Sequence, residues 1–91
     1  MKMILWLMAL SNAANVYAVV DRKCYVELAN DTYVVIQGTI KDSQSAEIVF
    51  QKKGFELNGQ LLMVKRVIEC QSTEQPFNLE AAQRQEKVQP R

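Results

Sequence analysis

The sequence predicts an α+β fold that is mainly β: a small antiparallel sheet of about four strands, built from two hairpins, with a short C-terminal helix and one disulfide. Two observations carry this prediction. Between residues 24 and 70, segments of alternating apolar and β-branched residues are separated by turn residues. The chain also holds two cysteines, Cys24 and Cys70, one at each end of this β-rich region.

Residues 1–18 have the pattern of a cleaved signal peptide. Lys2 supplies a positive charge, residues 3–10 form an apolar run, and Val16-Tyr17-Ala18 matches the small-x-small pattern of a signal peptidase site. The run is far shorter than the roughly 20 apolar residues that cross a bilayer. We therefore expect cleavage after Ala18 and export, with no stable membrane insertion of the processed protein.

The exported part is predicted to be one nearly neutral domain. Cleavage would leave 73 residues, with ten basic side chains, the chain's eleven less Lys2, against ten acidic ones. This balance lacks the excess of Lys and Arg that nucleic-acid binders carry. A domain of this length buries a small core, so a covalent staple is expected. We predict a Cys24–Cys70 disulfide, because there is no CxxC motif and no His or further Cys for a zinc site.

The first hairpin is predicted from residues 24–28 and 32–40, joined by the turn residues Ala29-Asn30-Asp31. In this register Val26 faces Val34 and Cys24 faces Ile36, which gathers apolar side chains on one face. The opposite face then carries Tyr25, Glu27, Tyr33 and Val35.

The second half of the sheet is predicted from a turn over 41–45 and a strand over 47–53, with Ile48 and Phe50 in phase. Asn58-Gly59 then indicates a hairpin that pairs Phe55 with Leu62. Because the apolar phase changes between these segments, we expect a β-bulge at Lys53-Gly54. The returning strand, 61–70, should place four residues on one face: Leu62, Val64, Ile68 and Cys70.

Residues 19–71 would thus form the disulfide-stapled β domain, and residues 72–91 a C-terminal helix or a flexible tail. The helix would run from Leu79 to about Val88, with Asn78 as its cap and Phe77 folding back toward Ala82. Its apolar stripe is thin, so both alternatives stay open.

Catalytic chemistry is not expected. The chain has no histidine and no Gly-rich phosphate loop, and we predict no catalytic residue, no cofactor and no metal site. Carboxylates such as Glu27, Glu56 and Glu69 are expected on solvated strand surface. A minor enzyme using paired carboxylates is the weakest alternative.

Two patches are the candidate partner surface. Lys52, Lys53, Lys65 and Arg66 are expected to lie close together across the second hairpin, as an anion-binding patch or, more simply, as charges that keep strand edges from pairing. Tyr25, Tyr33 and Val35 form an apolar patch, either a partner surface or the seat for Phe77 and Leu79. We favour the intramolecular cover.

Three short segments resemble a family of small exported bacterial proteins that belong to a type IVa, pilus-related secretion system. They are Lys23-Cys24-Tyr25-Val26 with Leu28 and Asn30, then Val67-Ile68-Glu69-Cys70, then Phe77, Ala81 and Pro90-Arg91. The resemblance implies a periplasmic or secreted protein of a Gram-negative bacterium, and it transfers the two cysteines but no catalytic residue.

These observations favour a non-enzymatic accessory protein of secretion that binds a protein partner in the cell envelope or secretion apparatus. The alternative is a periplasmic inhibitor of a hydrolase, which would present a loop such as 41–45 or 55–59 to an active site. Neighbouring genes would distinguish the two, because an accessory protein predicts secretion genes nearby and an inhibitor predicts a hydrolase gene.

Overall fold

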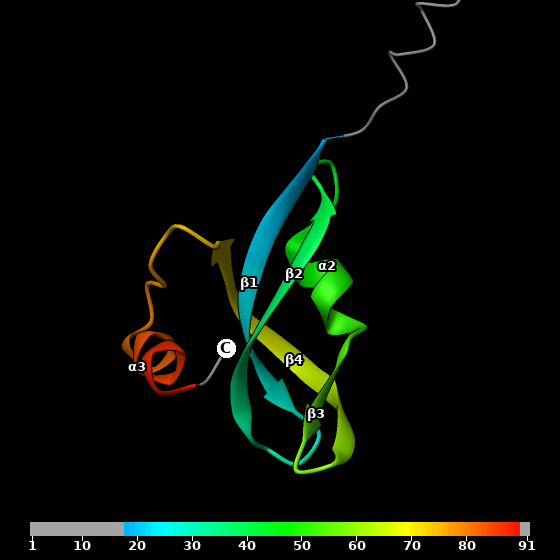
Figure 1. Cartoon of the computed structure of the whole chain (residues 1–91), viewed down its shortest axis with the longest axis vertical. Helices are drawn as coiled ribbons and strands as arrows, with labels where there is room; N and C mark the ends of the chain where they lie inside the picture. The colour runs from blue at the N-terminus through cyan, green and yellow to red at the C-terminus, as the bar shows by residue number, and fades with distance from the viewer. Residues whose placement is uncertain (1–17, 90–91) are drawn as a thin grey trace, which may run out of the picture.

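A computed structural model describes residues 18–89; the predicted signal peptide, apart from its last residue, lies outside them. Four antiparallel strands form one sheet in the order β2-β1-β4-β3, with a helix on either side (Figure 1). The elements in chain order are β1 (Val19–Leu28), β2 (Tyr33–Lys41), α2 (Ala46–Gln51), β3 (Gly54–Leu57), β4 (Gln60–Ser72) and α3 (Glu80–Val88). The predicted fold class, mainly β with a short C-terminal helix and one disulfide, is confirmed. Within residues 18–89, no helix has the length and apolarity to cross a membrane.

The first hairpin has the predicted register. Val26 pairs with Val34 and Cys24 with Ile36, and β1 begins five residues before Cys24, at Val19. The turn is closed by the Asn30 side chain, whose Oδ1 accepts a hydrogen bond from the Thr32 amide at 3.1 Å, while Asp31 adopts a positive φ of 70°. Asn and Asp are suited to this geometry because they tolerate the left-handed region and bond their own backbone.

The prediction of a strand over residues 47–53 is wrong, because residues 47–51 belong to helix α2. Ser45 caps this helix by accepting a hydrogen bond from the Ile48 amide. Ala46 and Phe50, four residues apart, are buried on one face, whereas Ile48 is 62% exposed. The apolar residues therefore follow the helical period and not the alternation of a strand.

The bulge predicted at Lys53-Gly54 is also wrong, since the change of phase is a change from helix to strand. Gly54 opens β3 and has no positive φ; a Cβ there would lie 2.9 Å from Leu61 Cδ1. The Asn58-Gly59 hairpin is confirmed. Both turn residues have positive φ, as a type I′ turn requires, and Phe55 pairs with Leu62.

Strand β4 is bulged where it pairs with β1, and this corrects the predicted face of Ile68. The register shifts twice, so Val67 pairs with Val26 and Cys70 with Cys24, and Ile68 has no direct partner. Ile68 consequently packs on the opposite face from Leu62 and Val64. Each bulge adds one residue to β4 and reverses its alternation.

The sheet separates two apolar clusters of different size. The α2 side contains the larger one, in which Phe50 from the helix packs on both hairpins; its ten buried members are Cys24, Val26, Leu28, Val34, Ile36, Ile40, Ala46, Phe50, Leu62 and Val64. The α3 side contains only Tyr25, Val35, Phe77 and Ala82, with Ile68 at its margin. The disulfide joins Cys24 to Cys70 across β1 and β4, as predicted.

Candidate partner-binding surface

The structure divides the predicted partner surface into three places. Two of its apolar members lie under α3, two of its cations join a cluster of ion pairs, and two others lie at the end of α2. Lys65 and Arg66, two of the four cations expected in a basic patch across the second hairpin, are paired with carboxylates of the first hairpin.

The apolar patch is covered within the molecule. Tyr25 and Val35 are 7% and 6% exposed, and the Tyr25 ring lies 6.4 Å from that of Phe77, centroid to centroid. Phe77 is itself 1% exposed and packs with Ala82, as predicted, whereas Leu79 stays 43% exposed and does not dock. Tyr33 is left at the margin, where it stacks on Tyr25 at 5.7 Å and keeps 37% exposure.

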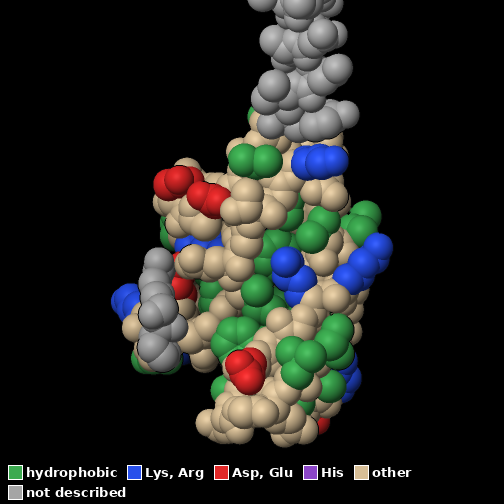
Figure 2. All heavy atoms as spheres, turned by 45° about the vertical axis from the view of Figure 1, so that its right-hand side comes forward, with side chains coloured by type: hydrophobic (Ala, Val, Ile, Leu, Met, Phe, Trp, Pro, Cys, Tyr) green, Lys and Arg blue, Asp and Glu red, His purple; other side chains and the backbone are tan. Residues whose placement is uncertain are grey.

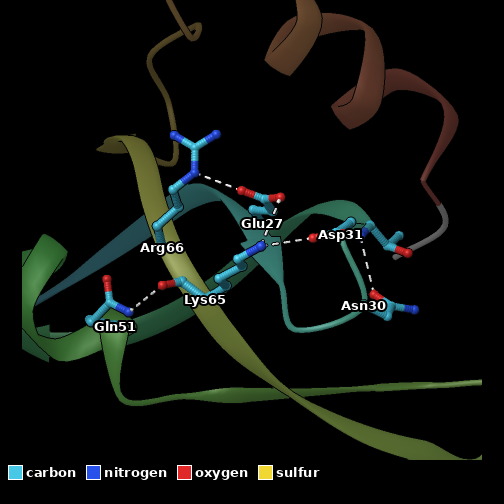
Figure 3. Close-up of polar contacts among 7 residues, drawn as sticks. Glu27, Asn30, Asp31, Gln51, Lys65 and Arg66 are labelled. Atoms are coloured by element: carbon cyan, nitrogen blue, oxygen red, sulfur yellow. Dashed lines mark hydrogen bonds and ion pairs between the residues drawn. The ribbon is translucent and has the colours of Figure 1, made fainter.

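Four charged side chains form what we call the charged cluster: Glu27, Asp31, Lys65 and Arg66 (Figure 3). Arg66 Nε donates to Glu27 Oε1 at 2.6 Å, Lys65 Nζ lies 3.9 Å from Glu27 Oε2, and Lys65 Nζ also donates to Asp31 Oδ1 at 2.9 Å. The bulges in β4 turn Lys65 and Arg66 toward the first hairpin. Glu27 was expected on solvated surface but is 7% exposed, and these cations compensate its burial.

The charges of this cluster stabilise one another. The hydrogen bond from Lys65 holds the pKa of the Asp31 carboxyl below its ordinary value, and the same bond raises the pKa of Lys65. The pKa of Arg66 is raised by its hydrogen bond to Glu27 and then by Tyr33. Asp31, Lys65 and Arg66 therefore stay ionised around neutral pH, and the cluster joins two acidic side chains to two basic ones.

Lys52 and Lys53 directly follow α2, and the Lys53 carbonyl accepts a hydrogen bond from the Val64 amide at 3.0 Å. The Lys53 ammonium lies 5.3 Å from the centroid of the Phe50 ring, and no carboxylate among residues 18–89 forms an ion pair with it. Figure 2 shows Lys and Arg side chains interspersed with apolar ones on one face of the molecule. Exposed apolar residues in this half of the chain include Ile48, Leu61 and Met63.

Sequence reasoning missed the polar groups that fix α3. Glu69, expected on solvated surface, accepts hydrogen bonds from the amides of Asn78 at 2.6 Å and Leu79 at 3.0 Å. It replaces the predicted Asn78 cap, and α3 begins at Glu80 with no side-chain cap of its own. Burial alone would raise the pKa of Glu69, but the hydrogen bonds from Asn78, Gln71 and Leu79 outweigh it, and the pKa lies below its usual value.

A buried cation makes the second attachment of α3. Lys23 is 3% exposed; its ammonium bonds both carboxylate oxygens of Glu86, at 2.9 and 3.0 Å, and lies 4.7 Å from the centroid of the Phe77 ring. The sequence around Lys23 gives no signal for this pair, because the charged residues Asp21 and Arg22 directly precede it. Such a lysine is usually read as a solvated edge residue.

Among residues 18–89, no group of three or more His, Cys, Asp or Glu side chains is placed to hold a metal ion. The exposed part of the charged cluster consists of Asp31, Lys65 and Arg66, whose side chains are 72%, 53% and 59% exposed, and Tyr33 lies beside Arg66. Arg and Tyr are the side chains most enriched in the energetic centres of protein interfaces.

The model of one protein family, described as type IVa secretion system protein TapY2-like, matches residues 1–91. The chain belongs to this family. The match confirms the resemblance inferred from the short motifs around Cys24, Cys70 and Phe77, and it makes the chain a type IVa secretion-system-associated protein. No curated protein and no solved structure matches it.

Proposed function

We propose that this TapY2-like protein is a small exported, non-enzymatic accessory component of a type IV pilus-like secretion system, and that it acts by binding a protein partner in the periplasm or outside the cell. The observation that carries the proposal is the family match over the whole chain, including the segment predicted to be a signal peptide. The chemistry of the exposed surface supports a protein as the ligand class.

The charged cluster, with Tyr33 beside it, is the surface we assign to this partner. The nearly buried Glu27 holds the Arg66 side chain in place, so little conformational entropy is lost when the guanidinium is contacted. The cluster joins two acidic side chains to two basic ones, which favours a mixed polar protein face over the continuous negative charge of nucleic acid.

Processing and capture test the proposal together. In a Gram-negative host with its secretion system, the protein should begin at Val19 and be found in the periplasmic or extracellular fraction. Cross-linking in intact cells should capture a component of the secretion apparatus. Arg66→Ala should reduce that capture about tenfold, as expected for an interface arginine, whereas Lys52→Ala should leave it unchanged.

Two results would contradict the proposal. One is an uncleaved protein retained in the cytoplasm. The other is capture of a hydrolase that the protein inhibits, which would favour the alternative function. Thermal unfolding of the Arg66→Ala variant, compared with that of Lys52→Ala, separates a lost contact from a lost fold.

A further inference from the structure

Strand β2 forms one edge of the sheet and pairs only with β1. In its antiparallel register, every second residue of β2 directs its amide and carbonyl away from β1. The amides of Val35 and Lys41 point outward, because each donates a hydrogen bond to a glutamine side chain and not to β1. Gln37 and Thr39, which lie between them at the same alternation, point outward as well. The outer edge of β2 therefore presents backbone groups along its length.

Two glutamine side chains occupy the ends of this edge. Gln89, directly after α3, accepts from the Val35 amide at 2.9 Å and donates to the Val35 carbonyl at 2.7 Å. These are the two bonds that a residue of an adjacent strand would make. Gln44 accepts from the Lys41 amide at 2.9 Å. No other described residue forms such bonds with the backbone of Gln37 or Thr39, so the middle of the edge is open.

The other strand edges of the sheet are short or irregular, and this one is neither. Strand β3, the opposite edge, is only four residues long. Strand β4 is bulged, and the Gln51 side chain donates to the carbonyls of Val64 and Lys65. Strand β2 is nine residues long, with no proline and no register shift. Natural proteins normally blunt an edge of this length, because it is a template for another strand.

A hollow lies over the face of the sheet beside the open section. It has a volume of about 420 Å³ and is lined by Asp21, Gln37, Gly38, Thr39 and Thr73. Position 38 is a glycine, and the ring of Phe50 packs where its side chain would lie. A Cβ on residue 38 would be 3.3 Å from Phe50 Cζ.

The two faces beside the open section carry opposite charges. On one face Asp21 accepts a hydrogen bond from Thr39 Oγ1 at 2.8 Å. On the other, the Lys53 ammonium lies 3.7 Å from the position of a Gly38 Cβ and forms no ion pair with any of residues 18–89. Successive residues of a strand point to opposite faces. A strand with an acidic and a basic residue side by side would therefore satisfy both charges.

We propose that the edge of β2 between Gln89 and Gln44 binds an extended segment of a partner protein as an added strand, and selects one with adjacent acidic and basic residues. The proposal deepens the proposed function and rests on it only for the natural source of the segment. A second copy of this chain fits less well, because its own α3 and 41–45 turn would meet Gln89 and Gln44, whereas one added strand needs only about 4.8 Å.

Two synthetic peptides of identical composition test this on the exported, oxidised protein. Both are five-residue capped strands of Thr and Val with one Glu and one Arg, which matches the open section between Val35 and Lys41. The two charged residues are adjacent in the first peptide and separated by one position in the second. In the second peptide both charges fall on the same face. The first should shift the NMR amide signals of Gln37 and Thr39 and bind about three- to fivefold more tightly than the second.

Matched variants locate the contact. Gln37→Pro removes an outward amide without removing a bond to β1, and should weaken binding at least about fivefold, whereas Gln37→Ala should not. Lys53→Glu should abolish the preference between the peptides, and Lys52→Glu should keep it. If Gln37→Pro fails to fold, the amide shifts and the Lys53 comparison still decide.

The proposal is overturned if millimolar peptide leaves the Gln37 and Thr39 amides unmoved, or if Gln37→Pro binds as the parent does. Concentration-dependent shifts of these amides without peptide would also overturn it, since a second copy would then be the occupant. Peptide binding without capture of any secretion component in cells would leave this edge site standing and contradict the proposed function.

Discussion

Different interactions stabilise the packing on the two faces of the sheet. On the α2 side, ten buried residues and a disulfide form a continuous core. On the α3 side, four buried residues support the helix, and polar contacts supply the rest: Lys23 with Glu86, Glu69 with two amides at the helix start, and Gln89 with the backbone of Val35. The first face depends on burial and a covalent bond, and the second on charge and hydrogen bonding.

This difference determines which changes lower the stability of each face. A core loses stability through cavities and through loss of its covalent constraint, largely independent of pH. A helix attached through carboxylates loses stability when those carboxylates are protonated. Each of the following changes acts on one face and leaves the other as its internal reference.

The largest effect is expected from the disulfide. Replacing Cys24 and Cys70 with Ala releases a closed loop with a sequence separation of 46 residues and should lower the free energy of unfolding by about 2–5 kcal/mol. Denaturant unfolding of the oxidised protein and of the double variant measures this difference. Thiol labelling provides the control: the unreduced, denatured protein should take up no label, and two reactive thiols after export would contradict the staple.

The next effect is expected from Phe77. Phe77→Ala removes the most buried ring of the α3 side and should lower stability by about 2–3 kcal/mol, less than for a ring in a closed core, because the helix can detach locally. Leu79→Ala is the matched control, since Leu79 is largely exposed, and should change stability by about 0.5 kcal/mol or less. Hydrogen exchange of the α3 amides reports detachment directly. Equal effects of both changes would mean that this face is not organised around Phe77.

The smallest effect is expected from Glu69, and it depends on pH. The pKa of Glu69 is lower in the folded protein than in the unfolded chain, so its contribution is present above the unfolded value and is lost as the pH falls through the folded value. Glu69→Gln should cost about 1–2 kcal/mol at pH 7 and nearly nothing in strong acid. Glu74→Gln, an exposed change nearby, should cost little at either pH. Unfolding followed at pH 7 and pH 3 tests the difference.

The first hairpin and the Asn58-Gly59 turn could be predicted because their signals are local. Alternation fixed the pairing of Val26 with Val34, and a turn that demands positive φ fixed the pairing of Phe55 with Leu62. Cys24 and Cys70 were paired correctly although the predicted alternation of β4 fails at Ile68, because the two bulges of β4 cancel and return Cys70 to the face of Val64. The seat of Phe77 followed from an apolar patch that required cover.

The errors arose where local signals were ambiguous or long-range. In residues 46–51 the apolar residues fit a strand and a helical turn alike, and the Ser45 cap was the deciding sign. The bulges of β4 depend on pairing with a strand some 40 positions away in the sequence, which no local pattern records. The partners of Lys23, Glu27 and Glu69 are likewise set by tertiary structure.

The disulfide also has a mechanical consequence. Strand β1 leads the folded domain and has neighbours on both sides, so a pull on the N-terminus loads it directly. Such a pull can peel away only the residues before Cys24, because the bond passes the tension to β4. The loop between the cysteines, which unfolded would extend to about 160 Å, is withheld from stretching. The part of the domain between the two cysteines would thus keep its length under load.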